Sequence, residues 1–278
     1  MSTSDVTPAL DDASFARLQQ LVRARTGISL GSNKRQLCQT RLIRRLRVLG
    51  LPTFQAYLAQ LDDPTAAEHD ELVNAITTNV TAFFREPHHF DWLAARCLPA
   101  LAQEPGRSRL RIWSAGCSSG EEPWTIAMVL DEAQLPARWD VKVLATDIDT
   151  QILATAEAGV YPEARTDQVS AARRQRYFTP ALGAERGQLR IAPNLRARVR
   201  FRALNLFDPW PMKQRFDVIF CRNVIIYFDA ENKARLIARF ADALAPGGHL
   251  VLGHSESLLR DVRGLAPAGK TIYRKAGP

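Results

Sequence analysis

Four apolar runs in the last two thirds of the chain have the composition of buried strands. They span residues 110–113, 141–149, 216–223 and 249–253, and helical segments such as 152–158 and 230–244 lie between them. A glycine-rich turn at 245–248 is expected between the last helix and the last strand. Strands that alternate with helices predict an α/β domain whose mostly parallel sheet is covered by helices on both faces.

The first part of the chain has helical spacing instead. A helix over residues 33–49 would bury Cys38, Leu42, Leu46 and Leu49 along one stripe. A second helix at 54–61 and a turn at 62–65 follow it. We therefore expect a flexible tail at 1–14, a helical domain at 15–76, a linker at 77–86 and the α/β domain at 87–278.

An irregular segment interrupts the α/β pattern after residue 158. Strand-like runs at 188–191 and 199–204 follow a polar helix, and residues 181–187 have the composition of a turn before the first run. We expect an insertion at about 177–203, and a plain structural excursion is an equal alternative to a functional subdomain.

The turn after the first strand carries the most specific chemistry. Gly116 and Gly120 let a ligand approach the backbone closely, and Pro123 suits a first helical turn. The motif is not GxGxxG, and Glu121 and Glu122 stand where a pyrophosphate needs neutral or positive surroundings. A ligand with positive charge and ribose hydroxyls fits better, and S-adenosylmethionine is such a ligand. A purely structural turn is the alternative.

The second strand ends in two carboxylates. An acidic residue in this position of a doubly wound sheet accepts hydrogen bonds from ribose hydroxyls, and Asp147 is our candidate. Alternatively, Asp147 or Asp149 caps the helix that starts near Thr150.

Composition limits the class of protein. The 278 residues are 46% hydrophobic and 24% charged, which is ordinary for a globular chain. No apolar run approaches the roughly 20 residues that span a bilayer, and the polar N-terminus resembles neither a secretory nor a transit signal. The four cysteines lack metal-ligand spacing, so we expect packed thiols in a cytoplasmic protein and no metal site.

The net charge is +8, and its placement is uneven. Between Asp12 and Asp62 there is no acidic residue. The expected helix at 33–49 would carry four of the basic residues there on one adjoining arc: Lys34, Arg41, Arg44 and Arg45. A solvated face, a nucleic-acid surface and a docking site for an acidic protein helix all fit this arc. No aromatic residues interleave with the charges, as stacking on single strands would require.

Six motifs in order make the chain similar to the CheR family of S-adenosylmethionine-dependent glutamate methyltransferases, which modify chemotaxis receptors. They lie at residues 77–86, 114–123, 145–149, 205–206, 221–228 and 253–256. The resemblance extends from about Phe15 to Lys275, and Trp124 stands where a tyrosine is more usual.

The resemblance implies a site and a reaction. S-adenosylmethionine would donate a methyl group to a receptor glutamate, leaving a methyl ester and S-adenosylhomocysteine. Arg85 and Tyr227 would serve the acceptor carboxylate, although Tyr227 also fits a core aromatic. Nine residues would contact the cofactor: Asn79, Thr81, Arg85, Glu121, Asp147, Asn205, Leu206, Arg222 and Asn223. The acceptor is ionised at neutral pH, so His88, His89 and His254 are not needed as bases.

The resemblance also selects among the partners. The basic arc would dock on acidic methylation helices of chemoreceptors rather than on nucleic acid. The insertion would contain a small antiparallel subdomain, which in some relatives pairs with a peptide from the receptor's C-terminus. A cytoplasmic monomer without direct membrane insertion is expected. A methyltransferase for RNA or a small molecule and a non-catalytic adaptor are the alternatives.

Overall fold

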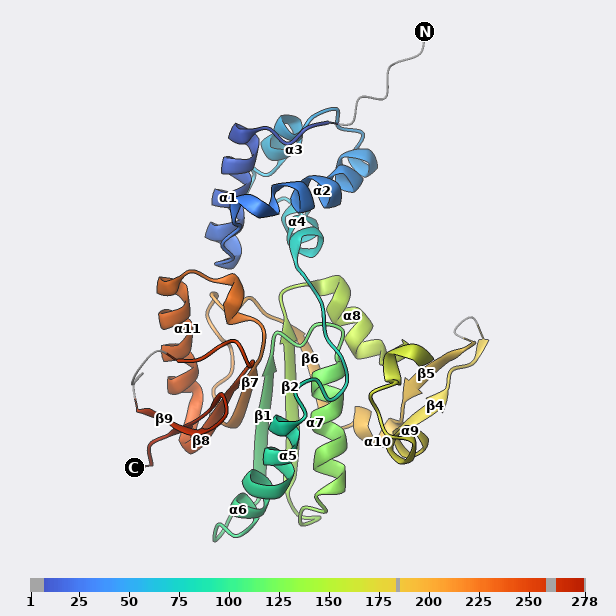
Figure 1. The fold of residues 1–278 in the computed structure, drawn as a ribbon, viewed down its shortest axis with the longest axis vertical. Coiled ribbons are helices and arrows are strands. Elements are labelled where there is room, and N and C mark those ends of the chain that lie inside the picture. Colours follow the sequence, from blue (N-terminus) through green and yellow to red (C-terminus); the bar gives the residue numbers. More distant parts are fainter. Residues whose placement is uncertain (1–7, 184–185, 259–263, 278) are drawn as a thin grey trace. The chain divides into compact units, whose positions relative to one another are not determined.

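The computed structural model describes residues 8–183, 186–258 and 264–277. By its internal contacts the chain forms two compact units. The first contains the residues up to Thr78 together with Tyr227–Asn232, and the second contains Asn79–Ile226 and the residues from Lys233 onward. Figure 1 colours both along the chain.

The first unit is helical, as expected. It comprises α1 (Asp12–Thr26), α2 (Arg35–Leu49), α3 (Phe54–Gln60) and α4 (Glu68–Ile76), with the 3-10 helix η1 (Ser32–Lys34) before α2. The stripe on α2 is correct, since Cys38, Leu42 and Leu46 are buried together with Leu18 of α1 and Tyr57 of α3.

The start of this unit differs from the expected tail at 1–14. Asp11 is the N-cap of α1, and its Oδ1 accepts a hydrogen bond from Ser14 N–H at 2.7 Å. The segment Asp12–Ser14 is therefore helical, and Leu10 is already buried. Residues 1–7 lie outside the part of the chain that the structure describes.

The second unit is built on a seven-stranded sheet in the order β6-β2-β1-β7-β8-β10-β9. The first five strands in this order are parallel, whereas β10 is antiparallel to both β8 and β9. Their bounds are β1 (Arg109–Ala115), β2 (Asp140–Asp147), β6 (Val199–Ala203), β7 (Phe216–Cys221), β8 (Leu244–Leu252), β9 (Leu265–Gly269) and β10 (Ile272–Lys275).

Helices cover both faces of this sheet. Side chains of successive strand residues point to opposite faces of a sheet, so those of Ile112 and Trp113 contact helices on different faces. Ile112 belongs to the core cluster that contains Met128 of α7, whereas Trp113 packs edge-on against Phe240 of α11 at 5.4 Å between ring centroids. The other helical segments are α5 (His88–Trp92), a π-helix (Leu93–Cys97), α6 (Leu98–Ala102), α7 (Glu121–Glu132), α8 (Thr150–Ala158), α10 (Pro193–Arg196) and α11 (Ala230–Ala243).

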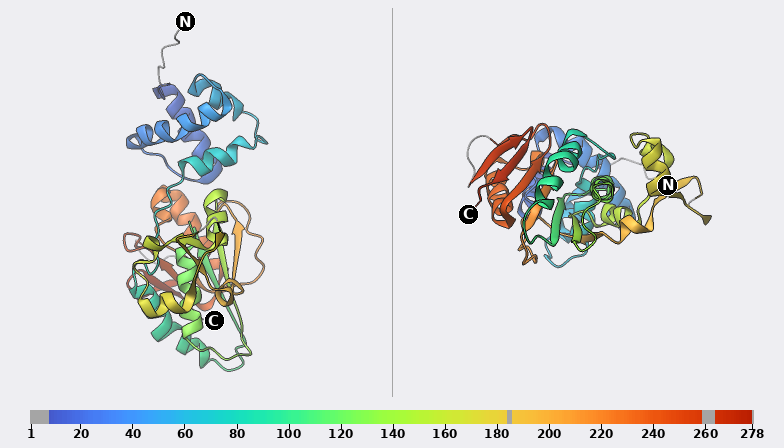
Figure 2. Two further views of the ribbon diagram at one scale, coloured as in Figure 1. Left: turned by 90° about the vertical axis from the view of Figure 1, so that its right-hand side faces the viewer. Right: turned by 90° about the horizontal axis from the view of Figure 1, so that it is seen from below.

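An insertion lies between α8 and β6. It holds β3 (Val160–Pro162), η3 (Glu163–Thr166), α9 (Ala171–Tyr177), β4 (Phe178–Pro180) and β5 (Gln188–Ile191), and its antiparallel sheet has the order β3-β5-β4. Within the second unit, this small sheet and the β9–β10 pair lie at opposite ends (Figures 1 and 2).

The expected insertion at 177–203 had the wrong bounds. The run at 199–204 is not part of the small sheet, because β6 pairs in parallel with β2 and forms the edge of the main sheet. The missing third strand is β3, which begins directly after Gly159. The expected turn at 181–187 joins β4 to β5, although residues 184 and 185 lie outside the described residues.

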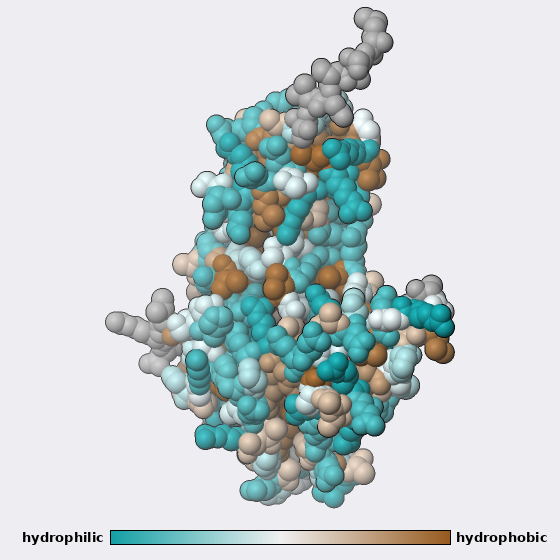
Figure 3. Space-filling view, turned by 45° about the vertical axis from the view of Figure 1, so that its right-hand side comes forward, coloured by the Kyte–Doolittle hydropathy of each residue, from teal (hydrophilic) through white to brown (hydrophobic). Residues whose placement is uncertain are grey.

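The end of the chain also differs from expectation. The glycine-rich run at 245–248 lies inside β8, where Gly247 has a φ of +74° and the pairing with β7 shifts register. The pair β9–β10 was not predicted. Among the described residues, no helix combines the length and the apolar character needed to cross a bilayer. The molecular surface seen in Figure 3 is largely hydrophilic.

Candidate cofactor site

The loop after β1 is shaped by two glycines that no other residue can replace without strain. Gly116 has a φ of +85°, and a Cβ there would lie 2.4 Å from Val224 Cγ2. Gly120 has a φ of +97°, and a Cβ there would lie 2.9 Å from both Ala156 Cα and Tyr161 Oη. The Gly116 N–H donates to Thr146 O at 2.8 Å, so the loop crosses over the end of β2. The expected turn is therefore a tight cradle at the carboxyl end of the sheet.

Asp147 and Asp149 have different environments at the end of β2. Asp149 is the N-cap of α8, accepting from the N–H groups of Gln151 and Ile152. Asp147 caps no helix; its Oδ2 accepts from Ser118 N–H at 2.7 Å and its Oδ1 from Asp149 N–H at 3.0 Å. Burial raises the pKa of Asp147 to about 6. The capping alternative thus applies to Asp149 and not to Asp147.

The loop after β6 lies next to Asp147, because the Leu204 N–H donates to Asp147 O at 2.9 Å. Asn205 and Leu206 follow directly. Asn205 Oδ1 accepts from Phe207 N–H at 3.0 Å, which fixes the turn, and the Leu206 side chain is buried. Both predicted residues therefore lie beside the cradle.

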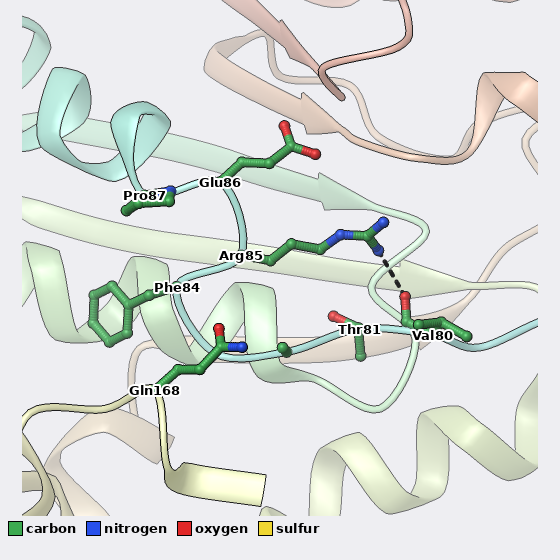
Figure 4. Close-up of a pocket in the computed structure, with 8 residues that line it drawn as sticks. Val80, Thr81, Phe84, Arg85, Glu86, Pro87 and Gln168 are labelled. Carbon is green, nitrogen blue, oxygen red and sulfur yellow. Dashed lines mark hydrogen bonds between the residues drawn. The ribbon is translucent and has the colours of Figure 1, made fainter.

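The linker carries three of the predicted residues. Asn79 Nδ2 donates to Asp149 Oδ2 at 2.7 Å, so Asn79 is beside the strand ends. Thr81 and Arg85 line a pocket of about 530 Å³ with six neighbours, Val80, Ala82, Phe84, Glu86, Pro87 and Gln168. Figure 4 shows the Arg85 side chain running back along the linker, where its Nη1 donates to Val80 O at 2.8 Å.

Glu121 and Glu122 point to different parts of the second unit. Glu121 has no exposed surface, and its oxygens accept from Ser119 Oγ and Arg165 Nη2. A ligand cannot reach it without rearrangement, so our choice of Glu121 as a cofactor residue is not supported. Glu122 retains 9% exposure, and Ser114 Oγ donates to its Oε1 at 2.7 Å at the end of β1. Burial raises the pKa of Glu122.

Arg222 also has another role than the one expected. Its side chain is only 3% exposed, and its Nη1 donates to Glu122 Oε2 at 3.1 Å. Its Nη2 donates to the backbone oxygen of Arg85, and its Cζ lies 5.2 Å from the centre of the Phe90 ring. Through these buried contacts Arg222 connects the linker to α7. The contacts give no support to a direct contact between Arg222 and a cofactor.

Glu256 is a site residue to which sequence reasoning gave no role. It is 3% exposed, and its Oε2 accepts from Asn223 N–H at 2.7 Å and Gly253 N–H at 2.8 Å. Its Oε1 accepts from Ile226 N–H at 3.2 Å. Asn223, with a φ of +59°, is thereby held in the left-handed region at the end of β7. The signal was a lone acidic residue shortly after β8.

Tyr227 belongs by its contacts to the helical unit. It ends η5 (Ile225–Tyr227), and its backbone oxygen accepts from Ser29 N–H at 2.8 Å. The neighbouring Phe228 forms an isolated bridge with Ile28. The half-buried Tyr227 side chain is thus not a member of the α/β core cluster, contrary to the alternative of a core aromatic.

The basic arc on α2 divides into two pairs. Lys34 and Arg44 are exposed. Arg41 Nη1 instead donates to the Ile76 and Thr77 oxygens at 2.9 and 2.6 Å, which caps the end of α4. Arg45 forms a bidentate salt bridge with Glu68, with N–O distances of 2.9 and 2.6 Å, and its guanidinium also lies 3.1 Å from Glu71. Arg41 and Arg45 therefore hold the helical unit together, and within this arc Lys34 and Arg44 are the residues left exposed.

The main sheet is mostly parallel, a glycine cradle follows β1, and a carboxylate that caps no helix ends β2. Together with the family match, these features define a Rossmann-like methyltransferase that uses S-adenosylmethionine. More narrowly, the chain belongs to the CheR methyltransferase family. Residues 79–273 match the SAM binding domain of CheR methyltransferase, and residues 13–77 match its all-alpha domain. The resemblance seen in the sequence is confirmed.

Individual relatives are similar along nearly their whole length. The chemotaxis protein methyltransferase of Klebsiella aerogenes is 44% identical, covering 95% of this chain and 90% of that protein. Its namesake in Salmonella typhimurium is 42% identical, covering 95% and 91%. Chemotaxis protein methyltransferase 2 of Pseudomonas aeruginosa is 42% identical, covering 99% and 100%.

The two kinds of arginine on α2 predict opposite effects of the same charge change. Arg45→Glu places a carboxylate beside Glu68 and Glu71 and should lower the free energy of unfolding of the helical unit by about 2–4 kcal/mol. Arg44→Glu, one residue away but exposed, should change it by less than about 0.5 kcal/mol. Hydrogen exchange of the α2 and α4 amides in increasing denaturant measures both; equal losses would contradict the division of the arc.

Proposed function

We propose that this protein methylates glutamate side chains in the cytoplasmic helices of chemoreceptors, at the expense of S-adenosylmethionine. The observation that carries the proposal is the 42–44% identity to chemotaxis protein methyltransferases over the helical unit as well as the catalytic one. The four buried free cysteines fit the cytoplasm that we propose as its location.

The cradle supports a specific set of cofactor contacts. The close backbone at Gly116 leaves room that a side chain would fill, and Asp147 offers a carboxylate to ribose hydroxyls. Asn205 and Leu206 would hold the adenine, one at its polar edge and one at its face. Asn79, Thr81, Asn223 and, in place of Glu121, Glu122 would complete the set. When bound, S-adenosylmethionine supplies an electrophilic methyl group and leaves as S-adenosylhomocysteine.

The chain's own part in the reaction is positioning. A substrate carboxylate is ionised at neutral pH, so no residue has to remove a proton from it. Arg85, on the rim of the linker pocket, would orient that carboxylate, and Tyr227 would donate a hydrogen bond to it. Catalysis then depends on alignment and on exclusion of water. The half-buried His88 and the buried His89 are not needed as bases.

Two surfaces support receptor binding by a monomer. Lys34 and Arg44 are exposed cations for an acidic methylation helix. In the small sheet, β4 has β5 as its partner strand among the described residues, so its other edge fits an extended receptor peptide. Receptor binding through these two surfaces would involve neither nucleic acid nor insertion into a membrane.

The proposed acceptor is tested by transfer of a radiolabelled methyl group to a receptor cytoplasmic fragment. We expect label that alkali releases as methanol, as a methyl ester requires, and no label on a matched fragment whose methylation-helix glutamates are changed to alanine. Label that resists alkali, or that appears on RNA instead, would refute the glutamate proposal while leaving the methyltransferase class intact.

The docking surface predicts a change in receptor recognition alone. Lys34→Glu with Arg44→Glu should raise the KM for the receptor fragment several-fold and weaken its salt dependence, because charge attraction brings the two proteins together. Affinity for S-adenosylhomocysteine should not change. Lys213→Glu with Arg215→Glu, the same charge change at exposed positions before β7, is the control. An equal rise in the control would assign the effect to net charge.

The pKa of Asp147 predicts a pH dependence of cofactor binding. Ribose hydroxyls need the ionised carboxylate, and burial raises the pKa of Asp147 to about 6. The affinity for S-adenosylhomocysteine should therefore fall as the pH decreases below about 6, by up to about tenfold per pH unit. Calorimetry between about pH 5 and pH 8 measures it. Asp147→Asn should abolish the dependence, whereas Asp140→Asn, at the exposed start of the same strand, should keep it.

A further inference from the structure

Three potential metal ligands gather where the linker meets α5. Glu86, His88 and His89 can each present one ligand atom so that all three lie within 4.8 Å of one another. The His89 side chain has no exposed surface, and that of Glu86 is 11% exposed. All three belong to the second unit, and none of them has a task in the proposed reaction.

The protonation of His89 follows from its neighbours. Its Nε2 lies 3.3 Å from Lys270 O and 3.0 Å from Thr271 Oγ1. A carbonyl oxygen only accepts, and the Thr271 hydroxyl itself donates to a carbonyl, that of Leu252 at 2.9 Å or Lys270 at 2.8 Å. The hydrogen of the neutral ring is therefore on Nε2, and Nδ1 carries a bare lone pair.

That lone pair faces a carboxylate. His89 Nδ1 is buried, has no hydrogen-bond partner among the described residues, and lies 3.6 Å from Glu86 Oε2. Two electron-rich atoms that face one another without a hydrogen between them repel, and a buried acceptor without a donor is destabilising. Glu86 Oε2 has a donor in the His254 N–H at 3.0 Å, whereas His89 Nδ1 has none, and a bound cation would satisfy that nitrogen.

His88 adds a second imidazole. Its Nε2 is also buried without a partner in the described part of the chain, and its ring centre lies 4.0 Å from that of His89.

The surroundings resemble the outer shell of a metal site. His254 donates to Glu86 through its backbone N–H at 3.0 Å, and its Nδ1 lies 2.9 Å from Glu86 Oε1. The Lys270 carbonyl orients His89 from the other side, as carbonyls do for metal-bound imidazoles. Arg222 lies 3.6 Å from Glu86 Oε2, but it also pairs with Glu122, so one guanidinium serves two carboxylates.

We propose that Glu86, His88 and His89 bind one divalent transition-metal ion of the zinc type. Two neutral imidazoles and one carboxylate form a ligand set that such ions favour, and water would complete a tetrahedral site. The ion would join the linker, next to Arg85, to α5 and through His89 to the turn before β10. The site is distinct from the cofactor contacts, and the proposal does not rest on the acceptor of the methyl group.

The test uses the full chain without a histidine tag, freed of metal with a chelator. Cobalt(II) is the probe, because its visible absorption reports tetrahedral coordination, and zinc(II) competes for the same site. We expect one equivalent to bind to the wild type. His88→Gln and Glu86→Gln should each weaken binding by at least roughly 10- to 100-fold, the range that even an outer-shell change costs. His249→Gln, which removes another histidine of this unit, should bind like the wild type.

Circular dichroism shows whether each variant is folded, and two ligand variants keep the test decisive if one is not. Zinc should also raise the thermal midpoint of the wild type but not that of the ligand variants. Absence of cobalt binding to the wild type, or equal affinity in the wild type and a folded ligand variant, would overturn the proposal.

Discussion

The architecture of the site depends on one buried cation. The Arg222 guanidinium, at the end of β7, contacts Glu122 at the start of α7 and the backbone oxygen of Arg85 in the linker. A guanidinium remains charged when buried, so it has to be paired, and its planar donors fix the direction of each partner. The loop after β1, the linker and the end of β7 are therefore held in one geometry by a single buried guanidinium.

Sequence patterns predicted those parts of the fold that local chemistry decides. The α2 stripe, the buried strands and the glycine turn follow from periodicity and backbone conformation, which a short segment carries by itself. The choice between Asp147 and Asp149 needed the structure, because both follow the same strand. Only the position of the α8 N-terminus shows that Asp149, and not Asp147, is the cap.

Other features depend on partners that are distant in the sequence. In the sequence, Arg41, Arg44 and Arg45 form one basic surface. In the structure, the acceptors of Arg41 and Arg45 lie in α4 or directly after it, so these two arginines are paired. The strand at 199–203 looked like part of the insertion, and its parallel pairing with β2 is a long-range choice. The Glu86 and histidine cluster was missed because its closely spaced residues acquire meaning only beside the turn at 270–271.

The insertion between α8 and β6 also contacts the loop after β1 and the start of α7. Its Tyr161 hydroxyl donates to Ser119 O at 2.6 Å, and its Arg165 is the cation that pairs with the buried Glu121 among the described residues. Deleting the insertion would leave the buried Glu121 without the Arg165 counter-ion and the glycine turn without the Tyr161 contact. A substitution at the inner edge of the insertion would therefore also alter the cradle, whereas one at the outer edge would leave these contacts in place.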